Sequence, residues 1–344
     1  MKSAIVFGVT GQDGSHLADL LLEKNYSVIG VSRRSSTDNT ERIKHILSNE
    51  NFKLVQGDIT DAFSVSGILK EYVHVDEIYN LAAQSHVAVS FKQPALTWDI
   101  TGKGCLNILQ SMIDLDMIGT RFYQASSSEM YGKSFDVHPA PAILGMKTVY
   151  NGKEERYQDE NTKFLPQSPY AIAKCAAHYM TRLVREGYGI HASAGILFNH
   201  EGPRRGETFV TRKITKWIGE FVKSGHDPEF PKLRLGNLEA YRDWGYAGDY
   251  VEAMWMMLQQ ESPDDYVICT GETHTIREFL DVAFKHIGID KWSKYVVQDP
   301  EFYRPAEVDY LRGCNDKAVN QLGWTPKHSF TDLVRLMVDH DTPD

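Results

Sequence analysis

Short, mostly apolar runs alternate with amphipathic stretches along the chain up to residue 198. The runs at 4–7, 27–31, 53–56, 77–81, 121–125 and 192–197 have the length and residue types of buried β-strands. The stretches at 15–24, 104–115 and 170–186 carry apolar residues at the three- and four-residue spacing of a helix that packs on one side. Strands separated by helices predict a parallel sheet with right-handed crossovers, and therefore an α/β fold.

The alternation loosens after residue 198, which predicts a second, smaller domain. We expect residues 1–198 to form the main domain, with a contribution from about 243–271, and residues 199–344 to form mainly a smaller α/β domain. Residues 133–167 are polar and contain proline and glycine, so we expect a long surface loop there.

A glycine-rich turn lies between the first predicted strand and the first predicted helix. Its sequence is GVTGQDG, residues 8–14, with glycine at every third position. Glycine permits the tight turn, and the amides at the start of the following helix attract a pyrophosphate. A tight turn without a ligand is the plainer interpretation, but this placement is typical of a Rossmann-type doubly wound sheet that binds a dinucleotide. The candidate cofactor residues of the turn are Gly8, Thr10, Gly11, Gln12, Asp13 and Gly14.

The residues after the second strand indicate which dinucleotide is bound. Enzymes that use NAD usually place a carboxylate there for the ribose hydroxyls, whereas arginine meets the 2′-phosphate of NADP. This chain has Arg33, Arg34, Ser35 and Ser36 there, and no carboxylate before Asp38. We therefore expect NADP, and a solvated basic corner is the alternative. Further expected cofactor contacts are Asp58 and Ile59 after the third strand, and Leu81, Ala82, Ala83, Gln84 and Ser85 after the fourth.

A tyrosine and a lysine four residues apart predict the catalytic end of the site. Tyr170 and Lys174, in SPYAIAK, share one face of the predicted helix, one turn apart. A lysine ammonium there stabilises the phenolate and reaches the nicotinamide ribose, so that Tyr170 becomes a general base near neutral pH. The strand at 121–125 runs into Ser126, Ser127 and Ser128, whose hydroxyls can bind a substrate oxygen. A packed tyrosine or a surface lysine is the plain alternative for each residue alone, but the combination resembles the extended branch of the short-chain dehydrogenase/reductase superfamily.

Composition and charge narrow the function further. The chain has 344 residues, of which 42% are hydrophobic, and a formal net charge of −9. General nucleic-acid binding is disfavoured because it needs a basic surface, so an anionic ligand must meet a local basic cluster. The longest apolar runs are too short to span a bilayer, and the N-terminal run does not resemble a signal peptide. The four scattered cysteines indicate a reducing, cytoplasmic compartment and no structural metal.

Longer motifs extend over nearly the whole chain. They are GVTGQDGS, VSRRSS, IYNLAAQSHV, FYQASSSEMYG, SPYAIAK, ILFNHEGPRRG, FVTRKI, GNLEAYRDWGYAGDYVEAMW and FYRPAEVD. Together they resemble the GDP-mannose 4,6-dehydratase family. The resemblance implies an NADP that is reduced and reoxidised within each turnover. It also implies that the substrate GDP-mannose becomes GDP-4-keto-6-deoxy-mannose, the precursor of fucose, rhamnose and related deoxy sugars.

A dehydratase has a use for Glu129 that a simple dehydrogenase or an epimerase lacks. Oxidation of the sugar's 4-hydroxyl to a ketone acidifies the hydrogen on carbon 5, and a carboxylate beside that carbon can remove it. We expect Glu129 to be this base and Ser127 to bind the 4-oxygen. Tyr170 is then the base of the first step and Lys174 its catalytic partner. A surface carboxylate is the plain alternative for Glu129.

The same resemblance assigns residues around the nucleotide sugar. It places His200 and Arg205 on the NADP side. The implied substrate contacts are Ser85, Ser127, Ser128, Glu129, Asn199, Lys213, Arg242, Arg304 and Glu307, with Glu307 facing the amino edge of guanine. A basic helix face is the alternative for Lys213. The chain departs from the family pattern at Ser127, where threonine is usual, at Gly202, where serine is usual, at Leu96, where tyrosine is expected, and in its longer 133–167 segment.

Two other classes of protein remain open. The first is a nucleotide-sugar epimerase or reductase on the same scaffold, which Glu129 and the arginine-rich second half disfavour. The second is a non-catalytic NADP-binding sensor, which has no need for proton-transfer groups. We favour a hydro-lyase. By analogy with the family, whose arginine–serine loop commonly meets a neighbouring subunit, we expect a homodimer or homotetramer.

Overall fold

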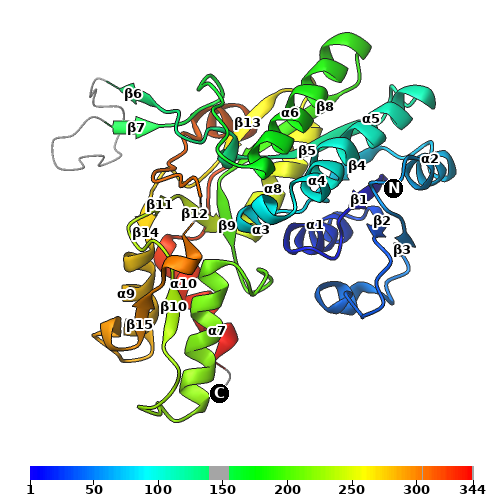
Figure 1. Ribbon diagram of the computed structural model, residues 1–344. Coiled ribbons are helices and arrows are strands. Elements are labelled where there is room, and N and C mark those ends of the chain that lie inside the picture. Colours follow the sequence, from blue (N-terminus) through cyan, green and yellow to red (C-terminus); the bar gives the residue numbers. More distant parts are fainter. Residues whose placement is uncertain (139–154, 304, 343–344) are drawn as a thin grey trace.

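A seven-stranded parallel sheet forms the centre of the molecule (Figure 1). The computed structural model describes residues 1–138, 155–303 and 305–342. The strands of the sheet are β1 (Ser3–Phe7), β2 (Ser27–Ser32), β3 (Phe52–Gln56), β4 (Glu77–Asn80), β5 (Arg121–Ser127), β8 (Ala192–Leu197) and β13 (Asp265–Ile268). Their order is β13-β8-β5-β4-β1-β2-β3, and every neighbouring pair is parallel.

The strand order reverses between β1 and β4. From β1 the chain adds β2 and β3 on one side and then crosses over to add β4, β5, β8 and β13 on the other. In open parallel sheets, ligands bind beyond the carboxyl ends of the strands at this switch point. Gly8 after β1, Leu81 after β4 and Ser127 at the end of β5 therefore lie along the same edge.

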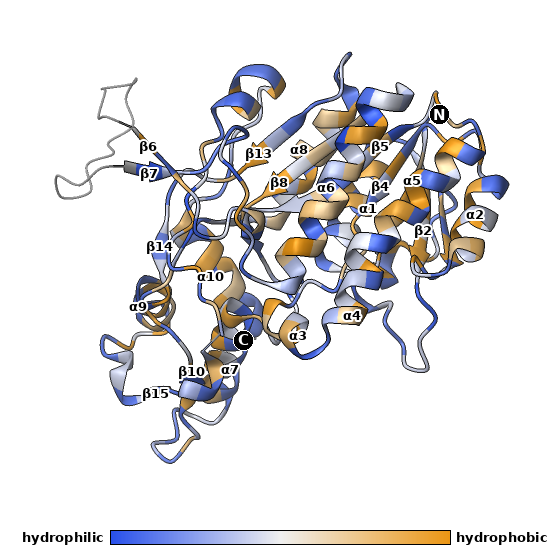
Figure 2. Ribbon diagram, turned by 45° about the horizontal axis from the view of Figure 1, so that its top comes forward, coloured by the Kyte–Doolittle hydropathy of each residue, from blue (hydrophilic) through white to orange (hydrophobic). Residues whose placement is uncertain are grey.

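Helices cover both faces of the sheet (Figure 1). Helices α1 (Gln12–Glu23) and α8 (Ala247–Gln259) pack on one face, and α2 (Ala62–Glu71), α5 (Gly104–Asp114) and α6 (Pro169–Tyr188) pack on the other, with the short α3 (Val87–Lys92) and α4 (Pro94–Thr97) beside α6. Strands β4 and β8 are buried along their whole length, and the helices are hydrophobic where they meet the sheet (Figure 2). In the described part of the chain, none of the helices is long and apolar enough to cross a membrane.

The residues after β8 build a smaller body beside the sheet. Its helices α7 (Val210–Lys223), α9 (Ile276–His286) and α10 (Phe330–Asp341) enclose a separate hydrophobic core. Short ladders join β9 (Asn199–Glu201) to β12 (Trp244–Tyr246), β10 (Leu233–Leu235) to β15 (Val296–Gln298) and β11 (Tyr241–Arg242) to β14 (His274–Thr275). Short 3-10 helices lie at η1 (Glu41–Ile46), η3 (Ser128–Met130), η4 (Trp292–Lys294) and η5 (Pro300–Phe302). Short π-helical segments lie at η2 (Trp98–Lys103), which joins α4 to α5, and at η6 (Ala318–Leu322). Helix α8 follows β12 directly and returns the chain to the large sheet, so the two parts are joined more than once.

Helix α6 has strong start and stop signals. The hydroxyl of Ser168 accepts a hydrogen bond from the amide of Ala171 (3.1 Å), and Pro169 is the first helical residue. Gly189 ends the helix in the left-handed region, with φ of 68°. These signals fix where the helix begins, and so where Tyr170 lies relative to β5.

The α/β sheet predicted from the sequence is confirmed, with shifts of one to three residues at most element ends. Strand β5 runs two residues further than expected, so Ser126 and Ser127 belong to the strand. The prediction of a loop throughout 133–167 is wrong at two places within that segment. There, β6 (Asp136–His138) and β7 (Glu155–Tyr157) form an antiparallel ladder, and residues 139–154 lie outside the described residues. Strands of three residues are too short for their alternation to be recognised in a sequence.

A buried carboxylate closes the edge of the sheet opposite to the switch point. Glu77, at the start of β4, accepts hydrogen bonds from Lys2 Nζ (3.2 Å), Tyr26 Oη (3.0 Å), Tyr79 Oη (2.7 Å) and Gln259 Nε2 (3.1 Å). These donors come from the chain start, the residue before β2, β4 and α8. The cluster therefore connects several elements at the edge where no ligand is expected.

Candidate active site

The turn after β1 has no room for side chains. Gly8 has φ of 83°, and a Cβ on it would lie 2.9 Å from the backbone nitrogen of Ala82. A Cβ on Gly14 would lie 2.2 Å from the carbonyl oxygen of Gly8. Gly11 precedes α1 and gives it no side-chain cap, so the first amides of the helix are left for another acceptor. This cradle fits a pyrophosphate held against the start of α1.

Two polar residues at the start of α1 connect the turn with β9. Asp13 Oδ2 lies 2.8 Å from His200 Nε2, and Gln12 Nε2 donates to the carbonyl of His200 (3.1 Å). Burial opposes the charge on Asp13, but His200 more than offsets this and holds the pKa of Asp13 well below its usual range. Burial likewise opposes the charge on His200, yet Asp13 raises the pKa of His200 above its ordinary value. The buried Oε1 of Gln12 accepts no hydrogen bond within the described residues and is available to a ligand.

A basic cavity lies beside the ends of β2 and β3. It has a volume of about 430 Å³ and is lined by Arg33, Arg34, Gln56, Gly57, Asp58 and Ser64. Residues 33–36 are exposed, while Asp58 accepts hydrogen bonds from the amide and hydroxyl of Thr60 (2.9 and 2.7 Å). The structure thus brings the arginines together with Asp58 next to the glycine turn. Two guanidinium groups facing one cavity match the charge and geometry of a phosphate.

The segment after β4 offers mainly backbone to a ligand. The amide of Leu81 donates to the carbonyl of Phe7 (3.0 Å), which holds the segment against β1. The side chain of Gln84 is used internally, because it accepts from the amide of His86 (2.7 Å) and donates to Thr97 Oγ1 (3.1 Å). The side chain of Ile59 is buried in the core. Gln84 and Ile59 therefore shape the site, while Ala82 and Ala83 let the backbone approach.

The four candidate catalytic residues meet at the end of β5. Ser127 is the last residue of the strand, and its hydroxyl accepts a hydrogen bond from the amide of Glu129 (3.3 Å). Tyr170 hydrogen-bonds with Ser127, and the charge of Glu129 acts on the tyrosine. Ser127, Glu129 and Tyr170 are each 8% exposed, and Lys174 is 4% exposed. The interpretation of Glu129 as a surface carboxylate is therefore wrong.

The expected activation of Tyr170 is not present in the protein alone. Burial raises the pKa of Tyr170 to about 12, although the hydrogen bond with Ser127 acts in the opposite direction. Burial also lowers the pKa of Lys174 to about 8. The ammonium donates to the carbonyl of Ala125 (2.6 Å) and lies 5.8 Å from the centre of the Tyr170 ring. The lysine is therefore anchored to β5 and does not by itself make the tyrosine a base.

Residues expected around the nucleotide sugar come from β9, α7 and the chain around Glu307. Arg242 Nη2 lies 3.3 Å from Glu307 Oε1, so these two distant candidates do meet. Lys213 Nζ lies 3.7 Å from the centre of the Phe302 ring, and burial together with Arg234 lowers its pKa. The buried Oδ1 of Asn199 accepts no hydrogen bond within the described residues. Arg304 lies outside the described residues, and Ser85 is exposed at the cofactor edge.

Other basic residues of the arginine-rich segment have protein partners. Arg205 Nε lies 3.0 Å from Glu201 Oε2, and its guanidinium carbon lies 3.7 Å from the centre of the Phe209 ring. The charge of Arg205 acts on both Asp13 and Tyr170, so this arginine lies between the cofactor turn and the catalytic residues. Arg212 instead pairs with the buried Asp341 of α10 (2.8 Å) and serves packing.

Sequence reasoning missed two residues that support the site. Arg42 donates to the carbonyls of Arg204 (2.7 Å) and Thr10 (3.3 Å), and so ties the arginine-rich segment to the glycine turn. Asp243 accepts from the amides of Thr270 (2.8 Å) and Gly271 (3.0 Å), and burial raises its pKa to about 6. Asp243 follows Arg242 directly in the RDWG motif, which was a usable signal. Arg42 gave none, because its partners lie 32 and 162 residues away.

The fold and the catalytic face define the class of the protein. A doubly wound sheet with a glycine turn after β1, a serine at the end of β5 and a tyrosine–lysine pair on α6 is the arrangement of an extended short-chain dehydrogenase/reductase. Of the solved structures, UDP-glucose 4-epimerase of Thermotoga maritima superposes with a TM-score of 0.80 at 26% identity, covering 98% of each chain. That similarity extends over both parts of the molecule.

Comparison with known sequences narrows the class to one family. The sequence profile of GDP-mannose 4,6 dehydratase matches residues 5–140 and 145–337. GDP-mannose 4,6 dehydratase 1 of Arabidopsis thaliana is 50% identical over 349 residues, covering 99% of this chain and 90% of the plant protein. The GDP-mannose 4,6-dehydratase of Vibrio cholerae serotype O1 is 43% identical over 372 residues, covering 99% and 93%. The chain belongs to the GDP-mannose 4,6-dehydratase family.

The Asp13–His200 pair makes the free energy of unfolding depend on pH, with a loss of stability on each side of a window. Because the pKa of His200 is raised above 6.5 on folding, its contribution is fully present below pH 6.5 and is lost as the pH rises through the folded pKa. Because the pKa of Asp13 is lowered below 3.8, its contribution is present above pH 3.8 and is lost as the pH falls through the folded pKa. Both contributions are complete between pH 3.8 and 6.5.

We expect Asp13→Asn to lower the pKa of His200 from above 6.5 to below it. Without the carboxylate, burial and the charge of Arg205 act on the imidazole and favour its neutral form. The measurement is an NMR pH titration of the imidazole resonances, with His200→Gln to assign the signal. The same His200 pKa in the native protein and the Asp13→Asn variant would show that the ion pair does not form.

Proposed function

We propose that the protein converts GDP-mannose into GDP-4-keto-6-deoxy-mannose with loss of water, and that NADP is its cofactor. The observation that carries this proposal is the burial of Glu129 beside Tyr170 and Ser127 at the end of β5. Family membership supports the nucleotide-sugar substrate. The product is the first intermediate on the route from GDP-mannose to GDP-linked deoxy sugars such as GDP-fucose.

The residues around the switch point fit a nicotinamide dinucleotide. The glycine cradle and the uncapped start of α1 would hold the pyrophosphate, with Gln12 Oε1 as an open acceptor. The cavity at Arg33 and Arg34 would hold the 2′-phosphate, which favours NADP over NAD. Lys174 would reach the nicotinamide ribose. His200 lies beside Asp13 at the start of α1, and the charge of Arg205 acts on Tyr170. We propose that both residues lie on the NADP side of the site.

The side chains divide the proton transfers among them. A bound nicotinamide would supply the hydride chemistry, as acceptor from carbon 4 and donor to carbon 6, and a positive charge beside the site. Tyr170 takes the proton of the 4-hydroxyl, while Ser127 binds the 4-oxygen. Glu129 takes the proton of carbon 5, the 6-hydroxyl leaves with a proton as water, and a proton returns to carbon 5. The substrate therefore loses one molecule of water and undergoes no net oxidation.

The smaller body would bind the nucleotide part of the substrate. We propose that residues 1–198, together with about 243–271, bind NADP, and that residues 199–344 mainly bind the nucleotide sugar. Asn199 carries an open buried acceptor, and Lys213 and Arg242 provide positive charge for the diphosphate. Glu307, beside Arg242, is our candidate for the guanine amino edge. Arg304 stays a prediction from the sequence, as does a cytoplasmic location.

We also propose that the protein is at least a homodimer, with α6 at the interface. Ile172, Tyr179 and Leu183 of this helix are 52%, 53% and 53% exposed, and their spacing of seven and four residues puts them on one stripe. Leu106 of the adjacent α5 is 39% exposed. A contiguous apolar stripe on two neighbouring helices suits a second copy of itself across a two-fold axis. By analogy with the family, we expect the arginine–serine loop to meet a neighbouring subunit. Such a second contact would convert the dimer into a tetramer.

We expect native protein to form a 4-keto sugar from GDP-mannose without accumulating NADPH, and Glu129→Gln to form essentially none. The amide cannot accept the proton of carbon 5, so kcat should fall by at least about a thousandfold, as for loss of an essential base. The variant should still retain NADP. The assay combines product detection by mass spectrometry with absorbance at the NADPH band.

Two controls accompany this assay. Glu186→Gln, an exposed carboxylate on α6, should keep native activity. UDP-glucose and dTDP-glucose should not be consumed. Turnover of only a uracil or thymine nucleotide would overturn the substrate assignment, and near-native turnover by Glu129→Gln would remove Glu129 from its role.

We expect Arg33→Asp to weaken the binding of NADP about 10- to 100-fold and that of NAD less than about threefold. The substitution removes one charge-assisted hydrogen bond and adds a repulsive charge, and both act on the 2′-phosphate only. Calorimetric titration of cofactor-free protein measures both affinities. Arg335→Asp, an exposed site on α10, is the matched control and should change neither. Equal losses for the two cofactors would assign the arginine a structural role.

We expect Leu183→Arg to shift the native protein towards a monomer. An arginine on each copy would place like charges opposite each other in a two-fold contact. Size-exclusion chromatography with light scattering gives the mass at equal concentration. Leu336→Arg on α10, where the native side chain is 36% exposed, should leave the mass unchanged. A monomeric native protein, or an unchanged mass for Leu183→Arg, would exclude this interface.

A further inference from the structure

Helix α6 contacts the end of β5 at three successive turns. Tyr170 hydrogen-bonds with Ser127, and Lys174 Nζ donates to the carbonyl of Ala125 (2.6 Å). One turn further along, His178 Nδ1 lies 3.0 Å from Ser126 Oγ. Spacing by four residues puts all three side chains of α6 on the same face. The first two contacts belong to the catalytic machinery, and the third has no part in the mechanism.

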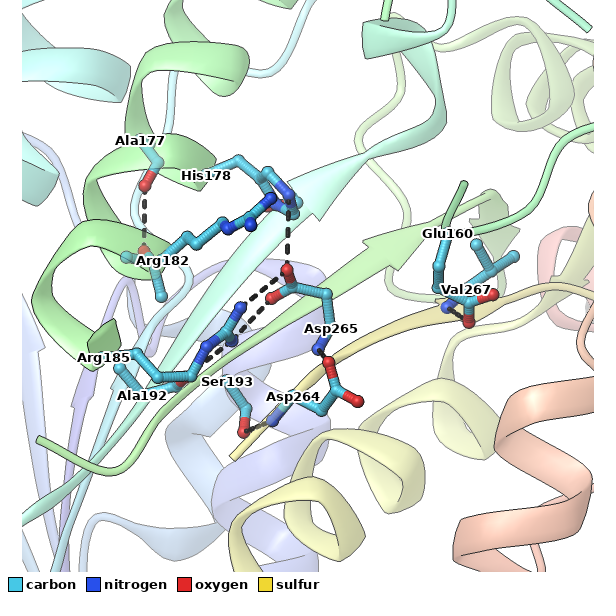
Figure 3. Close-up of polar contacts among 12 residues, drawn as sticks. Glu160, Ala177, His178, Arg182, Arg185, Ala192, Ser193, Asp264, Asp265 and Val267 are labelled. Atoms are coloured by element: carbon cyan, nitrogen blue, oxygen red, sulfur yellow. Dashed lines mark hydrogen bonds and ion pairs between the residues drawn. The ribbon is translucent and has the colours of Figure 1, made fainter. Parts of the chain in front are cut away.

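The second nitrogen of His178 is directed at an acidic residue on a third element. His178 Nε2 lies 3.6 Å from Asp265 Oδ2, at the start of β13. Arg185, two turns along α6, holds the same carboxylate through two hydrogen bonds of 2.9 Å each. Figure 3 shows His178 and Arg185 reaching Asp265 from the same helix. The edge strand therefore braces the catalytic helix from one side, while β5 meets it along its face.

Burial and the nearby carboxylate together favour one hydrogen-bonding arrangement of His178. The imidazole is 4% exposed and Ser126 is 3% exposed, so neither exchanges partners with water freely. Burial lowers the pKa of His178, although Asp265 acts in the opposite direction, and the neutral ring has one donor and one acceptor nitrogen. A carboxylate can only accept, so Nε2 carries the hydrogen towards Asp265. Nδ1 is then the acceptor and the hydroxyl of Ser126 the donor.

We propose that His178 is a positioning residue for catalysis, which sets the end of β5 against α6 by accepting the hydroxyl hydrogen of Ser126. The inference rests on the proposed function, because it assigns His178 a share in placing Ser127 and Glu129. Ser126 is bonded directly to Ser127, whose hydroxyl in turn receives the amide of Glu129. A shift of the strand end therefore displaces the group for the 4-oxygen and the carbon 5 base together. Displacements of well under 1 Å matter to such geometry, because reacting atoms must lie close and aligned.

Three replacements of His178 separate its two contacts. Asparagine places an amide oxygen close to the position of Nδ1 and keeps an acceptor for Ser126. Glutamine places an amide nitrogen close to the position of Nε2 and keeps the donor towards Asp265. Leucine fills similar space and keeps neither. We expect His178→Leu and His178→Gln to lower kcat on GDP-mannose about tenfold, His178→Asn to lose less than about threefold, and KM to stay within about twofold throughout.

A separation of kcat from KM is the readout that a general loss of structure would not give. Bound NADP and the melting temperature are measured for each variant. Ser126→Ala should lower kcat like His178→Leu, and the double variant should lose no more than either single one. Arg182→Gln, on the same helix but exposed and paired with Glu186, should keep native kcat.

The outcomes distinguish this proposal from the proposed function. A native protein that forms no product from GDP-mannose overturns both. An active native protein with equal kcat for the asparagine, glutamine and leucine variants overturns the positioning role alone. If the leucine variant does not fold, the comparison of His178→Asn with His178→Gln still decides, because each keeps one of the two native contacts.

Discussion

Lys174 and the carbonyl of Ala125 form the contact on which the rest of the site depends. The lysine is 4% exposed, and an ammonium so far from water needs a hydrogen-bond acceptor. It finds one 2.6 Å away in the backbone of β5, which ties α6 to the strand at this turn. Tyr170, one turn earlier, then falls beside Ser127, and Ser127 receives the amide of Glu129. The relative position of these candidate catalytic groups therefore depends on how α6 lies on β5.

Some arginines of this acidic chain line an open cavity, whereas others are paired with carboxylates. The net charge is −9, yet Arg33 and Arg34 face a common cavity and are exposed. Arg212 and Arg185 face inward and are neutralised by Asp341 and Asp265. At this cavity a phosphate would meet two exposed guanidinium groups, whatever the net charge of the whole chain.

The sequence predicts those features that depend on neighbours along the chain. The glycine turn, the spacing of Tyr170 and Lys174 and the arginines after β2 are each contained in one short segment, and the structure keeps them together. Pairs such as Asp13 with His200, 187 residues apart, depend on how two remote segments meet, and no local pattern reports them. The pKa of Tyr170 in the protein alone likewise depends on the whole fold. Lysine spacing indicates proximity, but burial by the whole fold decides the direction of the shift.

The fold by itself does not choose between a dehydratase and an epimerase, since an epimerase superposes over nearly the whole chain with a TM-score of 0.80. Within the site, the proposed choice rests on Glu129. A negative charge at this position is unfavourable for ionisation of its neighbour Tyr170. The charge of Glu129 raises the pKa of Tyr170, and so makes the phenolate harder to form, while Arg205 acts in the opposite direction. An epimerase or a sensor would gain from replacing this buried carboxylate by a neutral group. A dehydratase needs a base for carbon 5 in addition to the tyrosine, so the role proposed for Glu129 requires the carboxylate, and Arg205 offsets part of its effect on the pKa of Tyr170.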